Sequence, residues 1–190
     1  DPSDLAAFAD RCPMSSILAD YPTKLATWLA GQGQPDYRSR QIGHWLFARR
    51  SGSFAEMTDL PARLRDDLAN RFAFWTSQIV RHTQAADETE KLLLRLTDAS
   101  DIECVLLRDG PRRTVCISSQ VGCAMGCVFC ASGLEGVKRN LTTAEILEQL
   151  LRLQRLLPPE ERLSHLVVMG MGEPLANLDE LLPALALAHR

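Results

Sequence analysis

The amino-acid sequence predicts an α/β protein with a small helical accessory domain, an antiparallel β extension, and then units that alternate a strand with a helix. Three observations predict this class. Apolar side chains recur at helical spacing from about residue 15 to 75, short apolar runs separated by turn-forming residues follow to residue 119, and strand and helix patterns alternate from residue 142. We therefore expect a helical domain at residues 1–77, and the β extension with an α/β core at residues 78–190.

The helical region is expected to contain one helix over residues 17–29 and another that starts near residue 42. A further helix is expected behind Thr58 or Asp59 as its cap, with Pro61 in its first turn. Its apolar side chains recur every four residues, at Leu60, Leu64, Leu68 and Phe72. The simplest interpretation is that these side chains form the core of a small helical bundle.

The extension and the core follow from the same kind of pattern. Strands are expected at residues 92–96, 102–107 and 114–118. A capping-box signature from Thr142 to Glu145 predicts a helix that ends near Leu157. An apolar strand at 165–169, a loop at 170–174 and a helix from about residue 178 complete the pattern. Parallel βα units collect functional groups at the carboxyl ends of their strands, which is where the 170–174 loop falls.

Composition narrows the class of protein. The chain has 190 residues, of which 46% are hydrophobic, and no apolar run approaches the roughly 18 residues that span a bilayer. Its first 20 residues lack the basic start and apolar centre of a signal peptide. We therefore expect a soluble cytoplasmic protein with no membrane contact. In that compartment six cysteines indicate metal binding or redox chemistry rather than disulfides.

Charge gives a weaker indication. The net charge of −3 does not suggest nucleic-acid binding. Residues 108–140 nevertheless carry five basic side chains against two acidic ones, the basic ones being Arg108, Arg112, Arg113, Lys138 and Arg139. Such a cluster suits phosphates, although a solvated surface explains it equally well.

Three cysteines, Cys123, Cys127 and Cys130, form the most informative motif of the chain. A structural zinc site is usually closed by four protein ligands, and this run supplies three. An iron–sulfur cubane is held by one thiolate per iron, so three thiolates would leave one iron open to a small molecule. Gly122 and Gly126 let the backbone turn around such a group. We interpret the loop as an iron–sulfur site, with zinc as the alternative and a disulfide as the least favoured reading.

The Cys-x-x-x-Cys-x-aromatic-Cys pattern resembles that of the radical S-adenosylmethionine (SAM) enzymes. The surrounding residues are similar to the RlmN and Cfr group of RNA methyltransferases, and five segments carry this similarity: 35–41, 54–59, 116–123, 139–141 and 168–175. The resemblance implies a partial (β/α)6 radical SAM barrel, of which the first βα units are present here. It also implies a [4Fe-4S] cluster on the three cysteines and SAM as cofactors.

The resemblance further implies the reaction, which is methylation of C2 of adenine in 23S rRNA, with tRNA as a further candidate, through a methylated cysteine. SAM would contact Gly172 and Glu173, Glu103 would remove the C2 proton, and Cys116 would release the product by forming a disulfide. The residues alone leave other readings open. Glu103 could be a solvated strand residue, Cys116 an inert core residue, and the 170–174 segment an ordinary turn.

The expected partners are ribosomal RNA, with tRNA as a further candidate, and an electron donor such as a flavodoxin, and we expect the protein to be a monomer. The resemblance implies that the helical domain helps to hold RNA, for which the candidates are Arg38, Arg40, Arg49 and Arg50. Cys12 and Cys104 are expected to be structural. The four histidines, His44, His82, His165 and His189, form no metal-ligand spacing.

The chain departs from the family pattern in two places. No cysteine follows Cys130, so the methyl-carrying cysteine is absent, and Val137 stands where the family often has an aromatic residue. We therefore expect a segment of a longer protein that is inactive alone. Two alternatives remain: a radical SAM enzyme with another substrate, and a non-catalytic iron–sulfur or zinc module that binds RNA or a partner.

Overall fold

The computed structural model describes residues 14–189 and divides them into two compact units. The first contains the described residues up to Gly43 together with Ser51–Phe74. The second contains His44–Arg50 and everything described from Trp75 onward. The chain therefore passes between the units three times. Among residues 14–189, no helix is both long and apolar enough to cross a bilayer.

The first unit is mainly helical. Its elements are β1 (Ser15–Ser16), α2 (Ile17–Asp20), α3 (Thr23–Gly31), α4 (Tyr37–Gly43), the 3-10 helix η2 (Phe54–Glu56), α5 (Ala62–Arg71) and β2 (Phe72–Ala73), with β1 parallel to β2. The predicted four-residue repeat is confirmed as core, because Leu60, Leu64, Leu68 and Phe72 are each at most 3% exposed. Trp28 packs edge-on against the Phe72 ring, with the ring centroids 5.2 Å apart.

Helix boundaries in this unit differ from the sequence prediction. The single helix expected at 17–29 is two helices, since Pro22 has no N–H to donate and disfavours helical geometry at the residue before it. The helix expected from residue 42 is the end of α4, which continues as the π-helix η1 (His44–Ala48). The predicted cap at Thr58 or Asp59 is wrong, because α5 begins after Pro61 without a side-chain cap.

The second unit is built on a five-stranded sheet in the order β3-β4-β5-β6-β9. The strands are β3 (Gln78–Gln84), β4 (Glu90–Arg95), β5 (Asp101–Asp109), β6 (Arg112–Cys116) and β9 (His165–Val167). The first four are antiparallel, whereas β6 and β9 are parallel. The predicted extension and the predicted βα unit therefore share one sheet, with β6 belonging to both. Strand β3 was not predicted individually.

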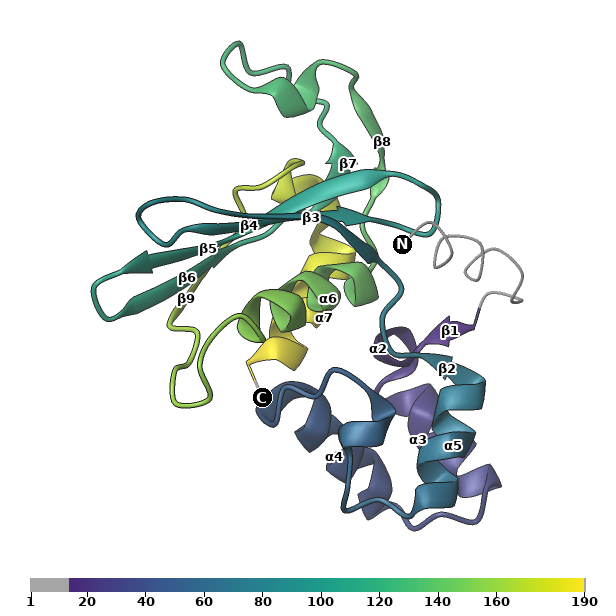
Figure 1. Ribbon diagram of the computed structural model, residues 1–190. Coiled ribbons are helices and arrows are strands. Elements are labelled where there is room, and N and C mark those ends of the chain that lie inside the picture. The colour runs from purple at the N-terminus through teal and green to yellow at the C-terminus, as the bar shows by residue number, and fades with distance from the viewer. Residues whose placement is uncertain (1–13, 190) are drawn as a thin grey trace. The chain divides into compact units, whose positions relative to one another are not determined.

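Helices α6 (Thr143–Gln154) and α7 (Leu178–Ala188) lie on one face of this sheet (Figure 1). The predicted capping box is confirmed: the Thr142 hydroxyl accepts a hydrogen bond from the Glu145 N–H, and the Glu145 carboxylate accepts one from the Thr142 N–H. The sheet side chains that face the helices are buried, among them Leu92, Leu94, Ile102, Cys104, Leu106 and Val115. The other face, which we call the open face, carries the half-buried or exposed side chains of Lys91, Leu93, Arg95, Asp101, Glu103, Val105 and Cys116.

The remaining elements lie between β6 and α7. Strands β7 (Gln120–Gly122) and β8 (Val137–Asn140) form an antiparallel pair. The segment between them contains the 3-10 helix η3 (Ala131–Gly133) and extends away from the five-stranded sheet (Figure 1). A further 3-10 helix, η4 (Pro174–Asn177), leads into α7. The motif-bearing loops thus follow β6 and β9 at their carboxyl ends.

Candidate functional site

Two segments far apart in sequence are hydrogen-bonded to each other where β6 and β9 end. The Gly170 N–H donates to the Ile117 carbonyl at 3.0 Å. The N–H groups of Ser119 and Gln120 donate to the Met171 carbonyl at 2.8 and 3.1 Å. The 170–174 loop is therefore held against the Ser-Ser-Gln run by the main chain itself.

Ser118 is the centre of this arrangement and is fully buried. Its hydroxyl donates to the Glu103 carbonyl at 2.6 Å and accepts from the Met171 N–H at 2.8 Å. The Gln149 side-chain amide, from α6, accepts from the Ser118 N–H at 2.8 Å and donates to the Ser118 carbonyl at 3.0 Å. One residue thus connects β5, the 170–174 loop and α6.

The 170–174 loop requires glycine for reasons that the structure makes explicit. Gly172 has φ +103°, a conformation that side-chain-bearing residues rarely adopt. A Cβ placed there would lie 2.6 Å from the Gln120 Cβ and 2.7 Å from its backbone nitrogen. At Gly170, a Cβ would lie 2.7 Å from the Ser118 hydroxyl. Glycine at position 172 therefore allows this turn to pack closely against the protein's own Ser-Ser-Gln run.

Glu173 has two contacts that fix its position. Its N–H donates to the Gln120 side-chain carbonyl at 2.8 Å, and its carboxylate Oε1 accepts from the Leu175 N–H at 3.0 Å. The carboxylate therefore caps η4 at its amino-terminal end. Glu173 is half-buried, so a ligand can still reach this carboxylate.

Two buried polar atoms near this turn have no hydrogen-bond partner among residues 14–189: the Ser119 hydroxyl and the Asn177 Oδ1. The other end of the Asn177 amide donates to the Ser119 carbonyl at 2.7 Å and the Leu141 carbonyl at 2.9 Å. Asn177 thereby joins the start of α7 to the strand ends, a role that the sequence patterns did not reveal.

The three cysteines of the motif lie together in the loop between β7 and β8, but their thiols are not gathered. Within the described part of the chain, no three His, Cys, Asp or Glu side chains are close enough to hold one metal ion. Cys127 is exposed, and Cys123 and Cys130 are half-buried. The Cys123 N–H is anchored to the Gly136 carbonyl at 3.1 Å, at the base of the loop.

The chemistry of this loop nevertheless suits an iron–sulfur group. Hydrogen bonds from the Ser132 hydroxyl, and then from the Ser132 and Gly133 N–H groups, lower the pKa of the Cys130 thiol. That shift favours the thiolate, the form that binds a metal. Gly126 has φ +61°, and a Cβ added there would meet nothing within 4 Å, so the turn between the first two cysteines has space around it. The donor set and its surroundings fit a cluster held by three thiolates.

Glu103 and Cys116 lie on the open face of the sheet. Cys116 is directly opposite Val105 in the antiparallel register, and Glu103 is two residues from Val105, so the three side chains point the same way. Glu103 is 44% exposed and forms an ion pair with Lys91, at 2.9 Å from Nζ to Oε1. Its carboxylate is therefore partly open to solvent.

The two sheet cysteines differ in environment. Cys104 is 1% exposed on the helix-covered face, as expected for a structural residue, and burial raises its thiol pKa to about 12. Cys116 is half-buried rather than an inert core residue. Partial burial raises the pKa of its thiol, and a hydrogen bond with the Met169 backbone opposes that shift. Cys12 lies outside the described residues.

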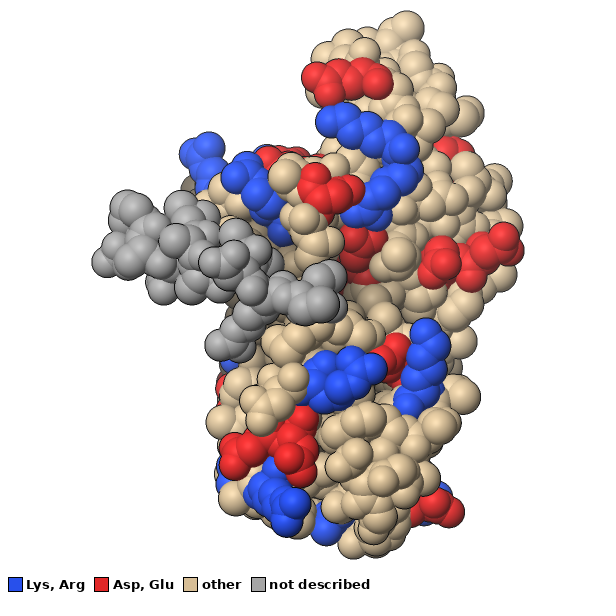
Figure 2. Space-filling model, turned by 90° about the vertical axis from the view of Figure 1, so that its right-hand side faces the viewer, with Lys and Arg blue, Asp and Glu red and all other residues tan. Residues whose placement is uncertain are grey.

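The basic side chains around the cysteine loop are mostly engaged by the protein itself. Arg108 pairs with Glu90, Arg113 with Glu161, and Lys138 lies 3.8 Å from Glu135. Arg139 bonds Glu145 through both terminal nitrogens, at 2.9 and 2.8 Å, and its Nε bonds Asp98 at 2.7 Å. Blue and red side chains are interspersed on the face drawn in Figure 2. This pattern favours a structural role for these residues over a phosphate-binding cluster.

Arg50, expected to contact RNA, is also bound within its own unit. Its Nη1 donates to the carbonyl of Gln154, the last residue of α6, at 3.2 Å, and to the carbonyls of Leu157 at 3.4 Å and Pro158 at 3.2 Å just beyond the helix. A cation at the carboxyl end of a helix is favourable because the last carbonyls have no intrahelical donor. Arg49 lies over the Trp45 ring at 5.1 Å.

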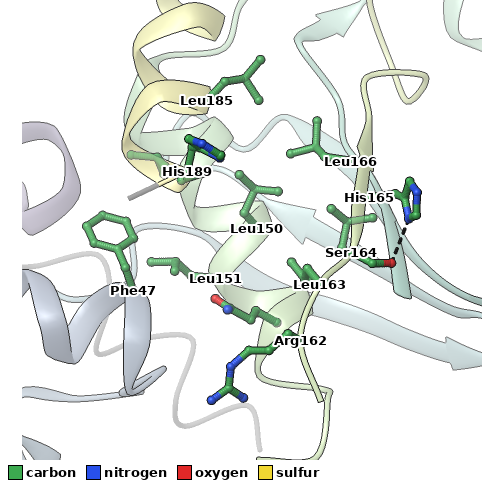
Figure 3. A pocket seen from close by; sticks show the side chains of 14 residues that line it. Phe47, Leu150, Leu151, Arg162, Leu163, Ser164, His165, Leu166, Leu185 and His189 are labelled. Atoms are coloured by element: carbon green, nitrogen blue, oxygen red, sulfur yellow. Dashed lines mark hydrogen bonds between the residues drawn. The ribbon is translucent and has the colours of Figure 1, made fainter. Parts of the chain in front are cut away.

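An apolar cavity of about 510 Å³ lies between the sheet and its helices (Figure 3). Its lining includes Leu150 and Leu151 of α6, Leu185 of α7, and His165 and Leu166 of β9. These β9 residues are at the amino-terminal start of the strand, whereas the predicted cluster and SAM-contact residues lie in loops that follow the carboxyl ends of β6 and β9. None of the predicted site residues lines this cavity.

Four residues that contact the predicted site were not identified by the sequence patterns: Lys91, Ser118, Gln149 and Asn177. Only the Ser-Ser-Gln run offered a signal, since consecutive polar residues directly after a buried strand need internal partners. The contacts of Gln149 and Asn177 join elements distant in sequence, and that of Lys91 depends on the register of two neighbouring strands, so no local sequence pattern predicts them.

Comparison with known proteins gives concordant results. The family model "Ribosomal RNA large subunit methyltransferase N-terminal domain" matches residues 18–74. A "Probable dual-specificity RNA methyltransferase RlmN" of Rhodopirellula baltica is 61% identical over 166 residues, covering 87% of this chain and 45% of the relative. One of the same description from Geobacillus thermodenitrificans is 42% identical, covering 95% of this chain and 50% of the relative. The chain thus spans about half the length of the curated relatives it matches.

A solved structure agrees with these matches. The crystal structure of a radical SAM methyltransferase from Sphaerobacter thermophilus superposes with a TM-score of 0.85 at 41% sequence identity, covering 94% of this chain and 52% of the other. Taken with the cysteine loop and the glycine-dependent turn beside it, these likenesses show that the chain belongs to the RlmN family of radical SAM RNA methyltransferases.

Proposed function

We propose that this chain is the amino-terminal part of a cytoplasmic enzyme that methylates C2 of adenine in 23S rRNA, with tRNA as a second substrate. The observation that carries the proposal is that Glu103 and Cys116 share the open face of the sheet, beside the turn at the carboxyl ends of β6 and β9. The names of the relatives, dual-specificity RNA methyltransferases, support an RNA substrate.

In this proposal Cys123, Cys127 and Cys130 hold a [4Fe-4S] cluster, and Gly172 and Glu173 contact SAM. When bound and reduced by a donor such as a flavodoxin, the cluster and SAM supply a carbon-centred radical. The protein supplies orientation: the Glu173 carboxylate is suited to the ammonium group of SAM, and the bonds among Ser118, Gln120 and the 170–174 loop fix where that carboxylate lies.

The open face supplies the groups that complete the transfer. Glu103 takes the proton from adenine C2 once the new carbon is attached, acting as a general base. Cys116 attacks the sulfur of the methyl-carrying cysteine and a disulfide forms as the carbon–sulfur bond breaks. The electron pair of that bond stays on the new carbon, which takes up a proton to become the methyl group, and the one electron supplied at the start would return to the cluster. The methyl-carrying cysteine follows Cys130 in the sequence of the whole protein. Strands that come later in the whole protein close the sheet into a partial (β/α)6 barrel. The enzyme works as a monomer.

The proposal is tested on the full-length protein with transcribed 23S rRNA, by mass spectrometry of the adenine product. We expect Cys127→Ala to lose both bound iron and methylation, and Glu103→Gln to keep its iron but lose methylation at least about 100-fold. Cys104→Ala, on the helix-covered face, is the control that keeps the iron. Residues 1–190 alone should give no product.

Two results would contradict the proposal. One is C2-methyladenine formed by residues 1–190 with SAM and RNA. The other is a colourless protein that takes up one equivalent of zinc and no iron under anaerobic reconstitution. The zinc result would favour the non-catalytic binding module instead.

A further inference from the structure

The ion pair between Lys91 and Glu103 is placed where it can act on the proposed reaction. Lys91 projects from β4 onto the open face, directly opposite Val105 in the register, so it reaches Glu103 diagonally across the strand pair. Nζ lies 2.9 Å from Glu103 Oε1, and the two side chains are 45% and 44% exposed. Both groups are accessible to a substrate on this face.

The Glu103 main chain is already fixed without Lys91. Strand β5 is paired on both sides, by β4 and β6, and the Glu103 carbonyl also accepts from the Ser118 hydroxyl. The side chain is different, because a glutamate has three rotatable bonds and loses much rotamer freedom only when its carboxylate is held. Among residues 14–189, Lys91 is the residue whose ion pair holds that carboxylate.

We propose that Lys91 is a positioning residue for the transfer, and that its ammonium group keeps the Glu103 carboxylate oriented toward the adenine C2 proton. The inference rests on the proposed function. Lys91 engages Oε1, which leaves Oε2 as the oxygen that takes the proton. Lys91 itself touches neither cofactor nor reacting carbon in this scheme.

A contribution to stability does not explain the pair. Exposed ion pairs contribute about 0–1 kcal/mol in general, and the strand ladder holds β4 to β5 regardless. A second pair on the same two strands and the same face offers a direct comparison: Arg95 and Asp101, with bonds of 2.8 and 2.9 Å and side chains 46% and 36% exposed. That pair is distant along the strand from Cys116 and has no role in the proposed reaction.

The experiment compares Lys91→Met and Arg95→Met in the full-length, cluster-loaded enzyme, with RNA carrying hydrogen or deuterium at the target C2. We expect Lys91→Met to lower kcat about 10- to 100-fold, as misplaced catalytic groups do, with KM for RNA within about twofold. The deuterium isotope effect should rise, because proton removal becomes slower than the other steps. Lys91→Arg should restore most of the rate, and SAM cleavage without RNA should be unchanged.

Several outcomes would overturn the inference. Lys91→Met behaving like Arg95→Met would reduce the pair to an ordinary surface contact. A raised KM for RNA with an unchanged isotope effect would make Lys91 a phosphate contact instead. Glu103→Gln, assayed in parallel, distinguishes a failure of the proposed function from a failure of this inference. If Glu103→Gln retains full activity, the proposed role of Glu103 is wrong. If Glu103→Gln is inactive while Lys91→Met has normal activity, only the role of Lys91 is refuted.

Discussion

The Ser-Ser-Gln run and the cysteine loop adjoin each other in sequence, yet they are stabilised in opposite ways. Ser118, Ser119 and Gln120 are each at most 4% exposed and are held by side-chain and main-chain hydrogen bonds from three other elements. In the cysteine loop Val128 is fully exposed, and Phe129 and Leu134 are 89% and 83% exposed.

This difference shows which part of the site the polypeptide builds unaided. The turn proposed to orient SAM has its internal partners without any ligand, so it is preorganised by packing. The loop proposed to hold the cluster has exposed apolar side chains and separate thiols, and binding of a metal group often supplies the folding free energy of such a segment. Substitutions in the two regions should therefore have very different effects on the metal-free protein.

Glycine substitutions should give the largest contrast. Gly172→Ala places a methyl group 2.6 Å from the Gln120 Cβ at φ +103°, so we expect overpacking and backbone strain to remove about 2–5 kcal/mol of stability. Gly126→Ala, at φ +61° with open space around it, should remove only about 1 kcal/mol. Urea unfolding of the metal-free protein measures both. Equal losses would mean that the turn is no more tightly packed than the loop.

Two adjacent serines allow a smaller and sharper comparison within the buried run. Ser118→Ala leaves the Met171 N–H without its acceptor, and we expect a loss of about 1–3 kcal/mol. Ser119→Ala removes a hydroxyl that has no partner among the described residues, so its effect should be close to zero. Both residues are fully buried, which removes differences in exposure. A stability loss at Ser119 equal to that at Ser118 would contradict the proposed importance of the Ser118 bridge.

The smallest effect on stability is expected at low pH, from the ion pair between Asp98 and Arg139 of β8 beside the cysteine loop. The hydrogen bond from Arg139, and then the Ser100 N–H, lower the pKa of Asp98 from 3.8 to about 2. Because the pKa of Asp98 is lower in the folded state than in the unfolded state, its ionised carboxylate stabilises the folded protein above pH 3.8. This contribution to the free energy of unfolding is lost as the pH falls to about 2. Because Asp98 is 42% exposed, solvent reduces the effect to under about 1 kcal/mol.

Asp98→Asn tests this contribution, with urea midpoints measured between pH 5 and pH 2. The variant should lose less stability over this interval than the parent protein. Parallel curves would show that the contact between Arg139 and Asp98 does not hold the base of the loop.

Elements with strong local patterns were predicted well. The repeat from Leu60 to Phe72 lies in the core, and the capping box at Thr142 starts α6, because apolar spacing and cap chemistry act within a few residues. Strand β3 was missed for a related reason: it is an edge strand whose residues are almost all exposed, so apolar and polar side chains do not alternate along it.

The candidate site was predicted in part. Its cysteine and glycine motifs are local and could be recognised, whereas Lys91 reaches Glu103 only through the register of two strands. Gln149 meets Ser118 only because α6 packs across the end of β6. Contacts of this kind depend on how strands pair and helices pack, so the spacing of residues along the sequence does not predict them.

The contact between Arg50 and the end of α6 determines how the helical region could be exchanged among relatives. His44–Arg50 belongs to the second unit although helices of the first unit precede and follow it. A chimaera joined near residue 74 would replace Arg50 together with the helical unit, and the carbonyls of Gln154 and Leu157 would then meet a foreign segment. Residues up to 43 and residues 51–74 could instead be replaced as two separate inserts, with His44–Arg50 left in place. This exchange would keep the contacts of Arg50 within the second unit.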